Sequence, residues 1–142
     1  IVMAYDEHHA GGEMGTVASL PYVKDGLANT MELVPKEKVI GAVPLYTRIW
    51  TVKDGETTSR AVGMKAAQKW IDENQVELEW LDDLGQYYGE LKGEDGSVQY
   101  IWMEDARSLA LKAEAVDESG AAGIAFWKLG FEPDEIWDVV NP

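Results

Sequence analysis

The chain has 142 residues, and its 26 acidic against 12 basic residues give a formal net charge of −14. One domain of this length can bury a sizeable core, because folding removes roughly two-thirds of the unfolded surface at this size, whereas a complete eight-stranded α/β barrel typically needs about 250 residues. The acidity argues against nucleic acid and against an anionic membrane surface as partners, since both attract clustered Lys and Arg. Six Trp and six Tyr against two Phe are an excess of aromatic residues with polar tips, which suits a sugar or ligand groove as well as a core.

Several classes of site and targeting segment are disfavoured. The absence of Cys excludes disulfides, thiolate metal sites and Cys nucleophiles, and no apolar run approaches the about 20 residues of a membrane helix. Residues 1–6 do not resemble a signal peptide; they read as a strand entered abruptly, which suggests a piece of a larger protein. His8 and His9 are adjacent, and neighbours in an extended segment point in opposite directions. We therefore expect no metal and no cofactor.

The first third of the chain predicts a strand, a helix and a second strand. Residues 1–5 form a short apolar strand, followed by a polar loop with glycines. Ser19 ahead of Pro21 marks the start of a helix, and Pro35 ends it. Residues 38–45 are almost continuously apolar, as in a strand buried on both faces of a parallel sheet. We expect a β-α-β unit with a right-handed crossover.

The pattern changes after Trp50. Residues 57–59 are Thr-Thr-Ser, which predicts the start of a helix. The apolar positions of that helix are Val62, Met64, Ala67, Trp70 and Ile71. Residues 76–81 alternate apolar and acidic side chains, as in a half-exposed strand, and residues 87–91 and 98–103 flank a turn-rich segment typical of a β-hairpin. The middle of the chain is therefore expected to be α+β and antiparallel.

The last third returns to the first pattern. Residues 104–118 predict a helix with an acidic start, and Gly120 lies just past its end. Residues 122–127 predict a second buried strand of parallel type, and Pro133 opens a last short helix.

We divide the chain accordingly into residues 1–50, 51–103 and 104–142. The acidity follows this division, because residues 1–50 contain six acids and four bases and residues 51–142 contain twenty acids and eight bases. A solvated acidic face is the plain explanation, and a functional acidic patch is the alternative.

Polar and aromatic residues gather where three of the predicted parallel strands end. Tyr5 and Asp6 end the first, Tyr46 and Arg48 follow the second, and Trp127 ends the third. In parallel α/β proteins functional side chains meet at this edge of the sheet. Together they would form a polar pocket with an aromatic floor, as in carbohydrate sites; ordinary packing at strand ends is the alternative.

These segments also carry motifs that resemble glycoside hydrolase family 18, the chitinases and endo-β-N-acetylglucosaminidases. Met-x-Tyr-Asp at 3–6, Pro-x-Tyr-x-Arg at 44–48 and Gly-x-x-x-Trp-x-x-Gly at 123–130 are similar to the ends of strands six, seven and eight of that family's barrel. Residues 3–9 and 102–108 are most similar to the spore-germination, cortex-lytic branch. The resemblance implies an α/β fold, the C-terminal part (strands 6–8) of a (β/α)8 TIM barrel, with an α+β insertion between strands 7 and 8.

The resemblance also implies a role for each residue in these motifs. Tyr5 would hydrogen-bond the N-acetyl group of the substrate during catalysis, and Asp6 would contact the same sugar. Substrate-binding roles fall to Met3 on the pocket floor, Tyr46 and Arg48 beside the sugar, and Trp127 stacked beneath it. For Trp127 alone, a core position on a buried strand is the alternative.

One motif of the family is missing. Its general acid closes an Asp-x-x-Asp-x-Asp-x-Glu motif on strand four, and the sequence contains no Asp-x-Asp-x-Glu. The acidic pairs at 82–83 and 104–105 have a different spacing. Because general-acid catalysis contributes roughly 100- to 10,000-fold, we expect little or no hydrolysis by this chain alone.

The resemblance therefore predicts a portion of a retaining, substrate-assisted hydrolase of β-1,4-linked N-acetylglucosamine polymers, with peptidoglycan cortex or chitin as substrate and a secreted, cell-wall or spore-associated parent. A non-catalytic, lectin-like carbohydrate-binding module of the same ancestry is the main alternative, and an acidic interaction domain is a third. The strands at Ile1–Tyr5 and Ala122–Trp127 would each lack a neighbour, so we expect self-association through these edges or a rearrangement around them.

Overall fold

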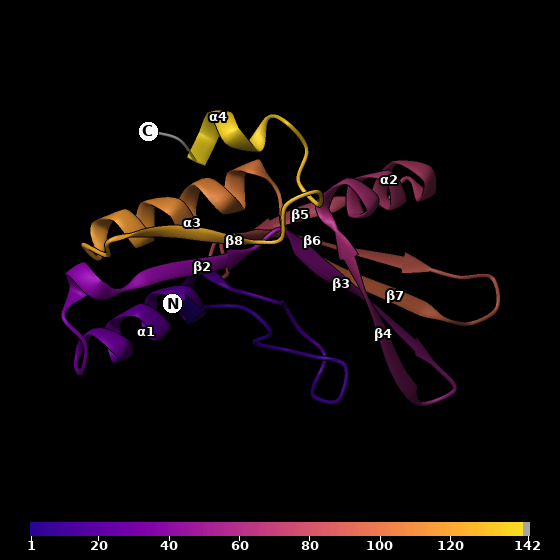
Figure 1. Cartoon of the computed structure of the whole chain (residues 1–142). Coiled ribbons are helices and arrows are strands. Elements are labelled where there is room, and N and C mark those ends of the chain that lie inside the picture. The colour runs from indigo at the N-terminus through magenta and orange to yellow at the C-terminus, as the bar shows by residue number, and fades with distance from the viewer. Residues whose placement is uncertain (141–142) are drawn as a thin grey trace.

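The computed structural model describes residues 1–140 and contains two β-sheets that lie side by side (Figure 1). The parallel sheet has three strands, β1 (Val2–Met3), β2 (Ile40–Pro44) and β8 (Gly123–Trp127), with β2 in the centre. The antiparallel sheet contains, in spatial order, β4 (Glu56–Gly63), β3 (Tyr46–Lys53), β7 (Val98–Met103), β6 (Gln86–Lys92) and β5 (Leu78–Leu81). The chain passes from the first sheet to the second at Leu45, between β2 and β3.

Within residues 1–140, most of the α-helices lie beside the parallel sheet, and the remaining helix lies beside the antiparallel sheet (Figure 1). Helix α1 (Leu20–Met31) and helix α3 (Ala106–Glu118) pack against each other, and the short α4 (Ile136–Val140) packs on α3. Helix α2 (Met64–Asn74) contacts β3 and β4, and a 3-10 turn, η1 (Lys36–Lys38), precedes β2. None of the helices in residues 1–140 is long and apolar enough to cross a membrane.

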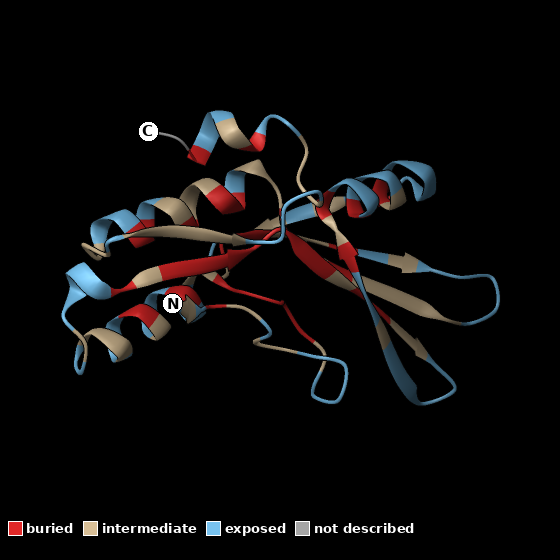
Figure 2. Ribbon diagram, viewed as in Figure 1, coloured by how far each residue is buried: buried red, intermediate tan, exposed pale blue. Residues whose placement is uncertain are grey.

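Buried side chains form one cluster beside each sheet. The first cluster lies between the parallel sheet and its helices and includes Leu27 of α1, Val43 of β2 and Val116 of α3. The second lies between the antiparallel sheet and α2 and includes Ile49 and Ile101. Figure 2 shows the buried residues concentrated on β2, on β3 and on the inner faces of the helices.

Most predicted elements are present. Ser19 caps α1 through a hydrogen bond from the Tyr22 backbone N–H, and the hairpin predicted around residues 92–97 is the β6–β7 pair. The shared register of β2 with β1 and β8 confirms the parallel arrangement of these strands. The last helix starts at Ile136, later than Pro133 suggested.

The predicted start of a helix at residues 57–59 is wrong. These residues belong to β4, and α2 begins only at Met64. Asp54 and Gly55 both have positive φ angles, of 51° and 80°, and join β3 to β4 in a tight hairpin. Asp-Gly is a strong signal for this two-residue turn, and the β-branched threonines that follow it favour a strand.

The chain leaves the parallel sheet directly after the second predicted strand. β2 ends at Pro44, and Tyr46 is the first residue of β3, which pairs with antiparallel partners in the other sheet. Tyr46 and Arg48 therefore lie in the antiparallel sheet and not at the end of a parallel strand. The division of the chain at residues 50 and 103 stays a prediction. Within the described residues, β1 and β8 are the edges of the parallel sheet.

Candidate functional site

Asp6 and Tyr46 form the centre of the candidate site. Asp6 follows β1 and has a φ of 60°, a left-handed conformation that Asp tolerates better than most residues. Its Oδ1 accepts a hydrogen bond of 2.5 Å from the hydroxyl of Tyr46. The turn at Asp6 and the start of β3 at Tyr46 thus bring two predicted site residues into direct contact.

Tyr5 lies against the same pair. Its ring and that of Tyr46 meet edge to face, with centroids 6.2 Å apart and planes inclined at 73°. Tyr46 is 7% exposed. Its burial, and then the hydrogen bond to Asp6, raise the pKa of the Tyr46 phenol well above 10, while burial and the neighbouring Asp6 charge raise the pKa of Tyr5. Both phenols are therefore neutral at physiological pH. The Tyr46 hydroxyl already donates its proton to Asp6, so the Tyr5 hydroxyl is the donor that can face a ligand.

Arg48 lies on the same face of β3 as Tyr46, because side chains two residues apart on a strand share a face. Its Nε donates to Oγ of Ser59 on β4 at 3.0 Å, and its guanidinium lies 5.9 Å from the ring of Trp50. Trp50 is buried, and its Nε1 donates to the carbonyl oxygen of Gly15 at 2.8 Å. The hydroxyl of Ser59 and the hydrogen-bonded indole of Trp50 therefore position the Arg48 side chain.

Met3 and Trp127 share a face of the parallel sheet. Met3 is in register with Ala42 of β2, and Trp127 is in register with Pro44, two residues further along the same strand. Both side chains are unusually accessible for apolar residues, at 66% and 55% exposure. The carbonyl oxygen of Trp127 accepts a hydrogen bond of 2.7 Å from the Leu45 N–H, at the junction of the two sheets. An exposed indole is a flat apolar surface on which a sugar ring can stack.

The structure thus arranges the six predicted residues in two sets. Tyr5, Asp6 and Tyr46 touch one another, with Arg48 beside Tyr46, while Met3 and Trp127 lie on the adjoining face of the parallel sheet. Their roles toward a sugar stay predictions. The described residues contain no group of three or more His, Cys, Asp or Glu that could hold a metal ion.

A loop connects Asp6 to α1, and its second half is buried although it has no regular secondary structure. Residues 15–19, the loop base, are all buried. Glu7 binds this segment three times: its backbone N–H donates to the Val17 carbonyl at 2.9 Å, and its carboxylate accepts from the Ser19 N–H at 2.7 Å and from the Ser19 hydroxyl at 3.2 Å. His8 donates from Nδ1 to the Thr16 carbonyl at 2.9 Å.

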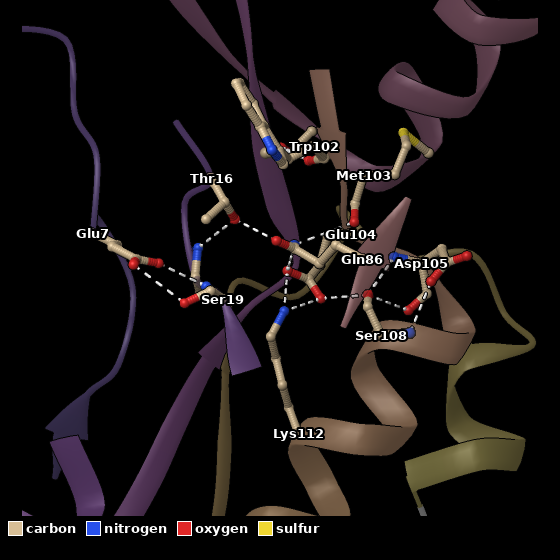
Figure 3. Close-up of polar contacts among 12 residues, drawn as sticks. Glu7, Thr16, Ser19, Gln86, Trp102, Met103, Glu104, Asp105, Ser108 and Lys112 are labelled. Atoms are coloured by element: carbon tan, nitrogen blue, oxygen red, sulfur yellow. Dashed lines mark hydrogen bonds and ion pairs between the residues drawn. The ribbon is translucent and has the colours of Figure 1, made fainter. Parts of the chain in front are cut away.

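A buried polar network joins the loop base to the antiparallel sheet and to α3 (Figure 3). At its centre, both carboxylate oxygens of Glu104 lie 2.6 Å from Nζ of Lys112, and the two side chains are 1% and 0% exposed. Ser108 donates to the same carboxylate at 2.6 Å, and Gln86 donates to it at 3.1 Å. Gln86 in turn accepts a short hydrogen bond from the hydroxyl of Thr16.

The spacing of three polar residues in the sequence is related to this network. Glu104, Ser108 and Lys112 are spaced by four, so they lie on one face of α3 and its N-terminal extension. That face also carries Leu109 and Val116 and is turned into the core. Burial raises the pKa of Glu104, and the Lys112 ammonium opposes this shift. The spacing by four places the three side chains on one face of the helix, and the packing around that face buries them.

Comparison with known proteins extends the resemblance seen in the motifs. The family described as Glycosyl hydrolases family 18 matches residues 1–132. The chain is 26% identical over 139 residues to the cortical fragment-lytic enzyme of Bacillus subtilis (strain 168), a match that covers 96% of this chain and 32% of that protein.

Two solved structures share the fold. The chitinase of Chromobacterium violaceum ATCC 12472 has a TM-score of 0.86 and 29% identity, with 97% of this chain and 43% of that chain covered. The spore cortex-lytic enzyme SleL of Bacillus megaterium QM B1551 has a TM-score of 0.83 and 26% identity, with 97% and 32% covered.

The chain spans 32% to 40% of the length of the first curated relatives it matches. The comparisons confirm the resemblance to the chitinase family and to cortex-lytic enzymes, and they confirm an α/β fold similar to part of the chitinase domain. The chain belongs to family 18 of the glycosyl hydrolases.

Proposed function

We propose that this chain forms one side of the sugar site of a family 18 hydrolase that acts on β-1,4-linked N-acetylglucosamine polymers, either chitin or peptidoglycan cortex. The observation that carries the proposal is the Asp6–Tyr46 hydrogen bond beside Tyr5, within a chain that the family matches over residues 1–132. The Tyr5 phenol offers a hydrogen-bond donor to a sugar, and the Asp6 carboxylate, which already accepts from Tyr46, offers a further acceptor.

In this proposal each of the six residues makes a different contribution to sugar binding. Tyr5 donates a hydrogen bond to the N-acetyl carbonyl of the sugar at the cleavage point, and Asp6, held by Tyr46, accepts from that sugar. Arg48 donates to sugar oxygens, while Trp127 and Met3 supply the apolar surface beneath the ring. The exposure of Trp127 and Met3 on one face of the parallel sheet supports this role, since neighbouring exposed apolar side chains can form a surface for a partner.

The chemistry would be substrate-assisted, with the carbonyl oxygen of the N-acetyl group attacking the anomeric carbon as the glycosidic oxygen leaves with a proton. The proton donor of the family is a Glu in an Asp-x-Asp-x-Glu motif, which this sequence does not contain. We propose that the chain binds sugar and does not cleave it by itself, and that a whole enzyme supplies the missing Glu from another part of the barrel.

The fold supports a matching placement within the family. We propose that β1, β2 and β8 correspond to strands six, seven and eight of a (β/α)8 barrel, and that the antiparallel sheet with α2 is the insertion between strands seven and eight. The parallel pairing of the three strands and the antiparallel pairing of the sheet between them support this assignment.

Titration of the chain with chito-oligosaccharides, followed by calorimetry or by tryptophan fluorescence, tests the binding site. We expect saturable binding that Trp127→Ala and Asp6→Asn each weaken about tenfold, because each removes one stacking surface or one charged acceptor. Tyr22→Ala, an exposed aromatic residue on α1, is the matched control and should leave the affinity unchanged. Equal affinity in all four proteins would show that the assigned residues do not form the site.

A hydrolysis assay distinguishes the proposed enzyme from the lectin-like alternative. The chain alone should release no product from a chromogenic chito-oligosaccharide, because no general acid accompanies Asp6. In a longer protein of the same gene that contains the Asp-x-Asp-x-Glu motif, we expect cleavage that Asp6→Asn strongly reduces. A longer protein that binds sugar, lacks the motif and cleaves nothing would favour the lectin-like module.

A further inference from the structure

We infer that Thr16 and Gln86, oriented by the buried Glu104–Lys112 pair, are positioning residues that hold the loop base and through it Trp50 and Asp6. The inference rests on the proposed function only where it concerns sugar. Its structural part follows from how one irregular, buried segment obtains its hydrogen-bond partners.

The loop base is a costly segment to bury. Residues 15–19 lie outside every helix and strand, yet all five are buried, and every buried backbone N–H or carbonyl needs a partner. Side chains provide several of them: Trp50 binds the Gly15 carbonyl, His8 binds the Thr16 carbonyl, and the Thr16 hydroxyl accepts from the Ala18 N–H at 3.2 Å. The conformation of the loop base therefore depends on side-chain hydrogen bonds, from Trp50 of β3, from His8 of the same loop and from Thr16 itself.

The buried Glu104–Lys112 pair determines the orientation of the Gln86 side-chain amide. The carboxylate of Glu104 can only accept hydrogen bonds, so the NH2 group of Gln86 must point to it and to the Met103 carbonyl, at 3.1 and 3.2 Å. The amide oxygen of Gln86 is then left to face Thr16 (Figure 3).

The direction of these bonds continues into the loop. Since the amide oxygen of Gln86 is an acceptor, the Thr16 hydroxyl must donate to it, and the lone pairs of that hydroxyl remain for the Ala18 N–H. All side chains of this network are buried, and no buried side-chain N or O atom in the described residues lacks a partner. A fully satisfied network of this kind favours one arrangement over its alternatives.

The loop base reaches the candidate site at two points, one beside Arg48 and one beside Asp6. Its Gly15 carbonyl holds the indole of Trp50, which lies beside Arg48 on β3. Its Val17 carbonyl accepts from the N–H of Glu7, the residue directly after Asp6. A shift of the loop base would therefore move Trp50 and Asp6 together, although neither touches Glu104.

Hydrogen exchange of the Trp50 indole N–H, followed by 15N–1H NMR, tests this inference without any sugar. We expect Thr16→Val, which keeps the shape and removes the hydroxyl, to speed this exchange about tenfold, while Thr16→Ser leaves it near the wild-type rate. The indole of Trp80, whose Nε1 donates to Asp82 at 2.8 Å away from the loop base, is the internal control.

Thr47→Val is the matched control for general destabilisation. Thr47 is as buried as Thr16, and its hydroxyl donates to the Trp102 carbonyl on β7, outside the network. This variant should leave the Trp50 indole unchanged. If Thr16→Val and Thr47→Val have the same effect on Trp50, or if neither has any, the positioning role is wrong.

Gln86→Met provides a second, independent variant. It should accelerate the Trp50 exchange as Thr16→Val does, and the double variant should add little further, because both remove the same link. Full additivity would overturn the inference. A wild-type chain that binds no chito-oligosaccharide would overturn the proposed function, and the indole exchange would still decide whether the network positions Trp50.

Discussion

The hydroxyl of Tyr46 donates a hydrogen bond of 2.5 Å to the carboxylate of Asp6, although the two residues are 40 positions apart in the chain. One follows the edge strand of the parallel sheet and the other begins a strand of the antiparallel sheet. The bond therefore joins the two sheets at the candidate site. We expect its loss to lower the free energy of unfolding as well as the affinity for sugar.

The pH dependence of stability tests this pair. Burial and the bond to Asp6 raise the pKa of Tyr46 in the folded state, whereas the phenol ionises near pH 10 in the unfolded state. The stabilisation is therefore fully present below about pH 10 and is lost as the pH rises further, because the unfolded state then releases a proton that the folded state retains. We expect the difference in unfolding free energy between the wild type and Tyr46→Phe to shrink from pH 8 to pH 11 in urea denaturation.

Asp6→Asn is the control for this measurement. It keeps the buried phenol and removes the negative charge, so the alkaline loss of stability should become smaller but persist, since burial is the larger cause of the raised pKa. A gap between the wild type and Tyr46→Phe that stays constant up to pH 11 would contradict the assigned environment of Tyr46.

Removing one member of the buried ion pair should destabilise the fold strongly. Lys112→Met leaves the Glu104 carboxylate buried without its cation, which costs about 3–5 kcal/mol in unfolding free energy. Adding Glu104→Gln to Lys112→Met should restore a large part of that loss, because no uncompensated charge then remains. Chemical denaturation of both variants gives the comparison.

Lys69→Met is the matched control for Lys112→Met. Lys69 pairs with Glu73 at 3.6 Å on the surface of α2, where the side chains are 73% and 62% exposed, so its loss should change stability by at most about 0.5 kcal/mol. Similar losses for the two lysines would mean that Lys112 is hydrated in solution.

Two glycines of the parallel sheet should respond oppositely to a methyl group. A Cβ on Gly41 would lie 2.8 Å from Val116 and 3.2 Å from Leu27, both buried, so Gly41→Ala should cost about 1–3 kcal/mol through overpacking. A Cβ on Gly123 would meet nothing within 4 Å, and Gly123→Ala should be neutral or slightly stabilising. Equal thermal shifts for the two variants would show that α1 and α3 do not pack on β2 as described.

The edges of the parallel sheet should support self-association. β1 and β8 each pair on one side only in the described residues, and Ile1 beside β1 is 80% exposed. We expect the mass from size-exclusion chromatography with light scattering to rise with concentration and Ile1→Lys to reduce that rise. Leu33→Lys, at an equally exposed apolar position outside the sheet, should have no effect, and a wild type that is monomeric at every concentration would contradict the prediction.

Local signals in the sequence predicted the elements that local geometry controls. Ser19 before Pro21 marks α1 because a side-chain oxygen and a fixed φ angle act within one turn. The same kind of signal exists at Asp54-Gly55, and giving weight to that turn would have predicted β4 in place of a longer helix.

The sequence indicated which residues form the candidate site, but it did not indicate how all of them are placed in space. The motifs around Asp6, Tyr46 and Trp127 identify the family, which the comparison confirms over residues 1–132. That Tyr46 begins an antiparallel strand was not foreseen, because the bend at Leu45 depends on a hydrogen bond to the distant Trp127 carbonyl.

The motifs at residues 3–6, 44–48 and 123–130 indicated the family from the amino-acid sequence. Periodicity and turn residues, which act over a few positions, indicated the β-α-β beginning and the antiparallel middle of this protein. The burial of Lys112 together with Glu104, and the link from this pair through Gln86 to Thr16, became visible in the three-dimensional fold alone. Burial of a charge depends on which segments pack around it, and here those segments come from three distant parts of the chain. For that reason the composition, which suggests that charged residues lie on the surface, cannot reveal the polar centre of the fold.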